Sequence, residues 1–91
     1  MNAIYKMTID FGRMGDLDGV FVADTDDVKK LIKSGQEIYF GEVLGKHTDV
    51  SCAIQNKHLT LVTTDEAFIE LFEKYDMSNG YNPFDYINEE E

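Results

Sequence analysis

The alternation of apolar and polar residues between positions 37 and 63 constrains the fold more than any other feature of this sequence. A period of two places successive side chains on opposite faces of a β-strand, so one face of this segment needs a core. Polar clusters at residues 45–49 and 55–58 divide the segment at hairpin spacing. We therefore predict a meander of antiparallel strands. The residues expected on its core face are Ile38, Phe40, Val50, Cys52, Ile54, Leu59 and Leu61.

Strict alternation would carry Glu42 onto the core face after Ile38 and Phe40. An unpaired buried carboxylate is strongly destabilising, or its pKa shifts until it is neutral. A β-bulge at Gly41 avoids this burial, because one extra residue turns Glu42 outward and brings Val43 inward. The sequence predicts the bulge. Without it, Glu42 would be the best functional candidate in the sheet.

Further strands are predicted before this segment. Residues 3–11 alternate in polarity, which indicates a strand with one wet face. Residues 19–23 are all apolar, as in a strand that is covered on both faces. The glycine-rich residues 12–18 lie between the two strands, so we expect a hairpin.

A first helix is predicted over residues 24–35. Asp24 or Thr25 is suited to cap its N-terminus, and Gly35 is suited to end it. Apolar residues at helical spacing form one stripe, which should pack on the sheet. These residues are Val28, Leu31 and Ile32.

A second helix is predicted after Thr63, which forms a capping-box pattern with Glu66. Asn79 and Gly80 are suited to the left-handed stop that follows such a helix. The apolar stripe expected to face the core consists of Phe68, Leu71, Phe72 and Tyr75.

These elements predict an α+β fold in the order ββαβββα. We expect a mostly antiparallel sheet of about five strands, with both helices packed on one face. Residues 1–80 should form the domain, and residues 81–91 should form an aromatic and acidic C-terminal tail.

The net charge of −10 restricts the classes of partner. Residues 59–91 carry nine acidic side chains against Lys74 alone, a net of −8. Such a field repels nucleic acid and anionic membranes and favours a protein with a basic surface. Acidity also keeps small proteins soluble, which is the alternative reading. The single cysteine, together with the lack of a signal peptide or a long apolar run, indicates the cytoplasm.

No pattern in the sequence indicates a cofactor or a catalytic centre. His47, Cys52 and His58 do not have zinc-ligand spacing, and alternation predicts that Cys52 points inward. Residues 16–19 match only part of a calcium loop, and residues 12–15 lack the helix of a phosphate-binding loop. We expect a non-enzymatic protein without a metal or cofactor.

The candidate partner-binding residues lie in the second helix and the tail. Acidic side chains at helical spacing can meet an Arg/Lys surface, although they are usually only the wet side of an amphipathic helix. The tail contains Asn-Pro-Phe, a tripeptide that some adaptor domains bind, but the favoured reading is that its aromatic residues fold back onto their own domain. The candidates are Asp65, Glu66, Glu70, Glu73, Tyr81 and Phe84.

The favoured function is a small acidic binding module, an inhibitor or regulator that occupies a basic surface of a nucleic-acid-handling protein and so acts as a nucleic-acid mimic. One alternative is a structural module that associates with itself, for example as a homodimer, which exposed sheet edges and a tail rich in aromatic residues suggest. Another is a small-ligand-binding domain that uses the sheet and its loops, for which the sequence offers only Asp10, Arg13, Glu42 and His47.

Overall fold

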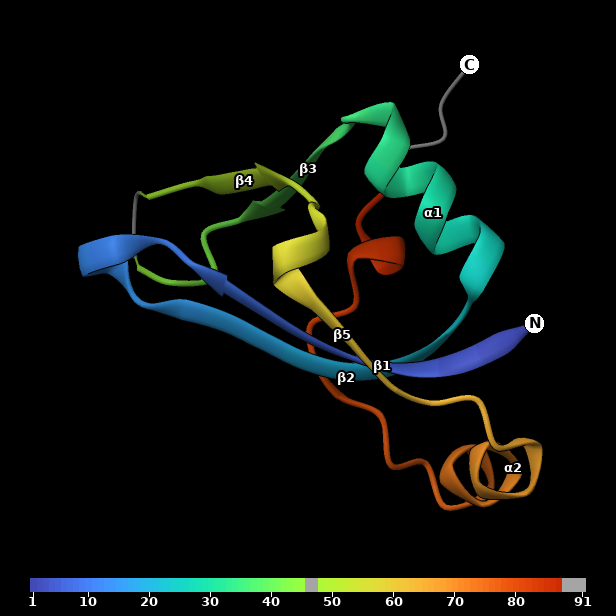
Figure 1. The fold of residues 1–91 in the computed structure, drawn as a ribbon. Coiled ribbons are helices and arrows are strands. Elements are labelled where there is room, and N and C mark those ends of the chain that lie inside the picture. Colours follow the sequence, from blue (N-terminus) through green and yellow to red (C-terminus); the bar gives the residue numbers. More distant parts are fainter. Residues whose placement is uncertain (46–47, 88–91) are drawn as a thin grey trace.

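The elements follow the predicted order, and a four-stranded antiparallel sheet lies between the two helices (Figure 1). The computed structural model describes residues 1–45 and 48–87. Its helices are α1 (Thr25–Ser34) and α2 (Glu66–Lys74), and short 3₁₀ turns span Gly12–Met14, Asn56–His58 and Pro83–Asp85. Its strands are β1 (Asn2–Asp10), β2 (Asp16–Asp24), β3 (Glu37–Gly41), β4 (Val50–Ala53), β5 (Leu59–Thr63) and β6 (Asn79–Gly80). The α+β class is confirmed.

The hairpin of β1 and β2 forms the centre of the sheet, whose strand order is β5-β1-β2-β6. The pairing is regular from Asn2 opposite Asp24 to Asp10 opposite Asp16. Alternate residues of β1 are buried on the predicted side, and Met7 is completely inaccessible to solvent. The period-two pattern therefore predicted this hairpin correctly.

The predicted meander is wrong in its last strand. The hairpin of β3 and β4 forms a separate two-stranded sheet, whereas β5 leaves it and pairs with β1. The nine-residue β1 offers a longer edge than the four-residue β4, and pairing there places Leu59 opposite Met7. Leu59 is partly buried against the core as a result, but Leu61 is 47% exposed at the outer edge of the sheet.

The predicted bulge is present in β3. Tyr39 pairs with Ser51 and Gly41 pairs with Val50, so Phe40 is the extra residue between them. Gly41 has a φ of 83°, a conformation that suits glycine. Glu42 is exposed, as the bulge predicts.

Most of the apolar side chains gather in a main core on the α1 side of the sheet. Asp24 caps α1 by accepting a hydrogen bond from the Asp26 amide, and Gly35 ends the helix in the left-handed conformation, as predicted. The buried residues of the main core are Ala3, Tyr5, Met7, Ile9, Leu17, Phe21, Val28, Leu31, Ile38, Phe40, Val50 and Ile54.

The second helix packs on the opposite face of the sheet, not beside α1 as the sequence suggested (Figure 1). Its buried residues Ile69 and Phe72 meet Ile4, with Val20 and Val22 at the margin, and we call this cluster the second core. Residues 3–5 of β1 are all buried, so the start of this strand is apolar on both faces. One helix therefore packs on each face of the four-stranded sheet.

The start and the end of α2 also differ from the prediction. Asp65 caps the helix by accepting hydrogen bonds from the amides of Ala67 and Phe68, so Thr63 is not the N-cap. The left-handed residue after the helix is Asp76, with a φ of 51°, instead of Gly80. The Met77 amide donates to the Phe72 carbonyl at 3.0 Å, which completes a Schellman-type end.

The tail docks on the main core as far as residue 87, in agreement with the fold-back alternative. Pro83 is fully buried, and the Tyr86 ring lies 5.0 Å from the Phe40 ring, measured between centroids. Tyr81 and Phe84 are also packed against this core. The division into a domain and a tail at residue 80 stays a prediction, and the predicted acidic end, Glu89, Glu90 and Glu91, lies outside the described residues.

Candidate functional site

A groove between the start of β1 and α2 collects the acidic side chains that the sequence singled out. Its volume is about 550 Å³. Glu66, Glu70 and Glu73 line it because positions i, i+4 and i+7 share one side of a helix. We call it the acidic groove, and its lining residues are Met1, Asn2, Glu66, Ala67, Ile69, Glu70 and Glu73.

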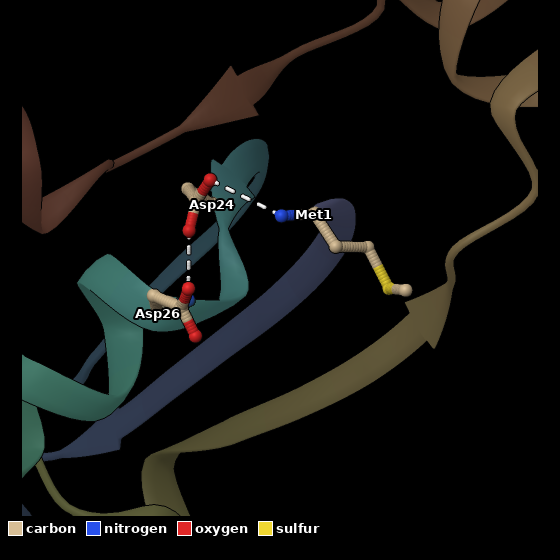
Figure 2. A network of polar contacts seen from close by, with 3 residues as sticks. All are labelled: Met1, Asp24 and Asp26. Atoms are coloured by element: carbon tan, nitrogen blue, oxygen red, sulfur yellow. Dashed lines mark hydrogen bonds and ion pairs between the residues drawn. The ribbon is translucent and has the colours of Figure 1, made fainter.

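The three glutamates have no cationic partner in the part of the chain that the structure describes. The only ion pair within residues 1–45 and 48–87 joins the Met1 ammonium to Asp24, at 3.3 Å (Figure 2). Lys74 is also on α2, but its ammonium lies 5.5 Å from the centre of the Tyr75 ring. The groove therefore presents negative charge that is free to meet an external cation.

The terminal ammonium of Met1, a residue that lines the groove, is held by Asp24, as Figure 2 shows. The Asp26 amide donates to the other carboxylate oxygen of Asp24 at 2.8 Å. This amide, followed by the ammonium, holds the pKa of Asp24 below its ordinary value, because both interactions favour the charged carboxylate. The Met1 side chain points away from this contact (Figure 2), and Met1 is one of the residues that line the groove.

The other predicted partner residues lie elsewhere. The Asp65 carboxylate is engaged at the N-terminus of α2 and is not among the groove residues. Tyr81 and Phe84 lie against the main core, so the fold does not bring them together with the glutamates. A partner-binding role for these three residues stays a prediction.

The sequence pattern missed an exposed apolar surface on α2. Phe68, Leu71 and Tyr75 were expected to be buried, but they are 46%, 49% and 64% exposed. We call these three residues the apolar row. Only Ile69 and Phe72 are buried against the sheet. The apolar surface on the α2 side of the sheet is narrow, because it consists of Ile4, Val20 and Val22. The signal available in the sequence was the even-numbered apolar set of β1 and β2, which contains just these residues.

Outside α2, Cys52 and His58 are two described residues with shifted pKa values. Burial raises the pKa of the half-buried Cys52 thiol, which donates to the Ala53 carbonyl at 3.3 Å. The Nδ1 atom of His58 accepts a hydrogen bond from the Gln55 amide at 3.1 Å, and burial, helped by Lys57, lowers the pKa of the imidazole. A low thiolate fraction makes Cys52 a poor nucleophile.

The structure locates some of the residues that the sequence offered for a small-ligand site. Arg13 is exposed on its 3₁₀ turn, and His47 lies outside the described residues. Among the residues with described positions, no group of three His, Cys, Asp or Glu side chains could hold a metal ion. Within the same residues, no helix is both long and apolar enough to cross a membrane.

No family model, curated protein or solved structure matches this chain.

Proposed function

We propose that this protein is a non-enzymatic module that binds a basic surface of another protein through Glu66, Glu70 and Glu73. The observation that carries the proposal is the placement of these carboxylates along one groove without a cationic partner among the described residues. Burying lysine or arginine side chains against such a row yields charge-assisted hydrogen bonds. The summed negative field also accelerates the encounter with a cationic partner.

The wider charge distribution supports a partner that itself handles nucleic acid. The net charge of −8 over residues 59–91 gives this part of the chain the sign of a phosphate backbone. A module of this kind would compete with nucleic acid for the same basic surface and would therefore act as an inhibitor or regulator. A cytoplasmic location belongs to the same proposal, since the one cysteine cannot form a disulfide within the chain.

Binding of a labelled oligo-arginine peptide tests the proposal. The wild-type protein should bind the peptide with an affinity that falls as salt rises, because salt screens the attraction between charges. A variant with Glu66→Gln, Glu70→Gln and Glu73→Gln should bind at least about tenfold more weakly, which corresponds to about 1.4 kcal/mol. Reversal of the same residues to lysine should abolish binding.

A charge-matched control separates the groove from the net charge of the molecule. Asp16→Asn, Asp18→Asn and Glu42→Gln remove the same number of charges from exposed positions outside the groove. This control should bind the peptide more tightly than the groove variant does. Equal losses in the two variants would show that only the overall charge matters, and the groove would not be a binding site.

A further inference from the structure

The outer surface of α2 has two flanks of different chemistry. A helix advances by about 100° per residue, so the row of Glu66, Glu70 and Glu73 lies on the opposite flank from Phe68, Leu71 and Tyr75. Ile69 and Phe72 occupy the side between the two rows that faces the sheet. The exposed residues Ala67 and Lys74 occupy the side that faces solvent.

We infer that the partner presents an amphipathic basic helix, which lies along α2 with its apolar side chains on the apolar row and its basic side chains toward the acidic groove. This inference rests on the proposed function and adds the chemical class of the partner. The apolar row alone could be covered by many surfaces. The unpaired carboxylates on the other flank of the same helix select a partner that carries both kinds of side chain.

The geometry of α2 suits a helical partner. Its nine residues extend over about 14 Å, and the two rows run along its axis, so one helix lying alongside can reach both. Ala67 lies on the solvent-facing side, where a small side chain lets the axes of packed helices approach to about 8–10 Å. Lys74 lies at the end of α2, over the Tyr75 ring, and leaves the first turns accessible.

Charge argues against a second copy of this chain as the occupant. Each copy would bring its own glutamate row and the net charge of −8 of residues 59–91 to the contact. Like charges brought together at an interface destabilise it. A basic helix instead neutralises the row while it covers the apolar side chains, so both flanks favour the same partner.

Two peptides of identical composition provide the test. In one peptide, leucines and lysines are spaced so that a helix has an apolar side and a basic side. In the other peptide the same residues are scrambled around the helix. The wild-type protein should bind the amphipathic peptide about tenfold more tightly in fluorescence anisotropy, because only that peptide can cover the apolar row. Equal affinities for the two peptides would overturn the inference.

Matched variants assign the preference to the apolar row. Phe68→Ser combined with Leu71→Ser should abolish the preference and keep the weaker binding of the scrambled peptide. Leu61→Ser combined with Val62→Ser should keep the preference, since these control residues are 47% and 51% exposed and belong to β5, not to α2. A preference that survives in the first variant contradicts the inference, provided that circular dichroism shows both variants folded.

The outcomes also separate this inference from the proposed function. If the groove variant with three glutamines binds the scrambled peptide as tightly as the wild type does, the proposed function fails. If only the preference for the amphipathic peptide is absent, the proposed function stands and the partner is not an amphipathic helix. Sedimentation that shows a wild-type dimer, dissociated by Phe68→Ser with Leu71→Ser, would identify a second copy as the occupant and overturn the inference.

Discussion

Gly19 of β2 pairs with Gly80 of β6, and neither residue has room for a side chain. A Cβ atom on Gly19 would collide with the backbone carbonyl of Tyr81. A Cβ atom on Gly80 would collide with the backbone of Asp18 and Gly19. The pairing holds the chain close to the edge of the sheet at the point where it passes from α2 to the docked tail.

The first prediction concerns this close approach. Gly19→Ala should lower the free energy of unfolding by about 2 kcal/mol or more, because the backbone at Tyr81 must move to admit the methyl group. Urea denaturation measures the change. Gly45→Ala is the control, since its Cβ atom would meet no heavy atom within 4 Å. Similar midpoints for the two variants would show that the backbone near β6 can move to admit the methyl group at little cost in free energy.

The second prediction concerns the end of α2. Asp76 adopts a φ of 51°, which is unfavourable for most residues with a side chain. Asp76→Gly should therefore stabilise the protein by about 0.5–1 kcal/mol, because glycine adopts this conformation without steric strain. Asp76→Ala should destabilise it, and the two urea midpoints should fall on opposite sides of the wild-type value. A glycine variant less stable than the wild type would contradict the assigned helix end.

The third prediction concerns pH. Because the pKa of His58 is lowered in the folded protein, the unfolded chain binds more protons just below pH 6.5, the ordinary value for histidine. The contribution of His58 to stability should be complete above about pH 6.5 and should fall as the pH drops from there to the folded pKa. Urea midpoints between about pH 5.5 and 7.5 measure this slope.

His58→Asn should reduce the slope, since its side-chain oxygen can replace Nδ1 as the acceptor for the Gln55 amide without titrating in this range. His47→Asn removes the other histidine and should leave the contribution of His58 in place. An unchanged slope in the His58 variant would rule out a lowered pKa at this residue.

The fourth prediction concerns the docked tail. A chain that ends at Gly80 should be at least about 2 kcal/mol less stable than one that ends at Ile87, since each well-buried large side chain contributes about 1.5–3 kcal/mol. The truncation removes the buried Pro83 and the contacts of Phe84 and Tyr86 with the main core. Thermal denaturation of the two truncated chains gives the comparison. If their melting temperatures agree, residues 81–87 do not stabilise the domain, and the partner-binding role of Tyr81 and Phe84 gains weight.

The sequence predicted those elements whose signals are local. Asp24 and Gly35 delimit α1 by capping chemistry that acts within a few residues, and the bulge at Gly41 follows from the need to keep Glu42 in water. The partner of β5 was mispredicted, because the choice between β1 and β4 depends on which edge is longer and free in the folded protein. Local patterns carry no information about that competition.

The candidate site was predicted only in part, because part of it depends on contacts between residues that are far apart in the sequence. The spacing of Glu66, Glu70 and Glu73 showed that they share one side of a helix, but the groove also needs Met1 and Asn2, which are far away in the sequence. The orientation of α2 was mispredicted because Phe68 and Ile69 belong to two overlapping apolar stripes. The sheet buries the stripe that contains Ile69, since only a narrow contact is available around Ile4.

The unequal sizes of the two cores imply that the molecule does not open as one unit. The main core joins α1, both sheets and the tail, whereas α2 is held by Ile69 and Phe72 on a small patch around Ile4. Segments with few buried apolar contacts open locally at a lower free energy than the global unfolding transition. Amide protons of α2 should therefore exchange with solvent before those of β1 and β2. A partner bound to the proposed surface would therefore rigidify a helix that opens more readily than β1 and β2.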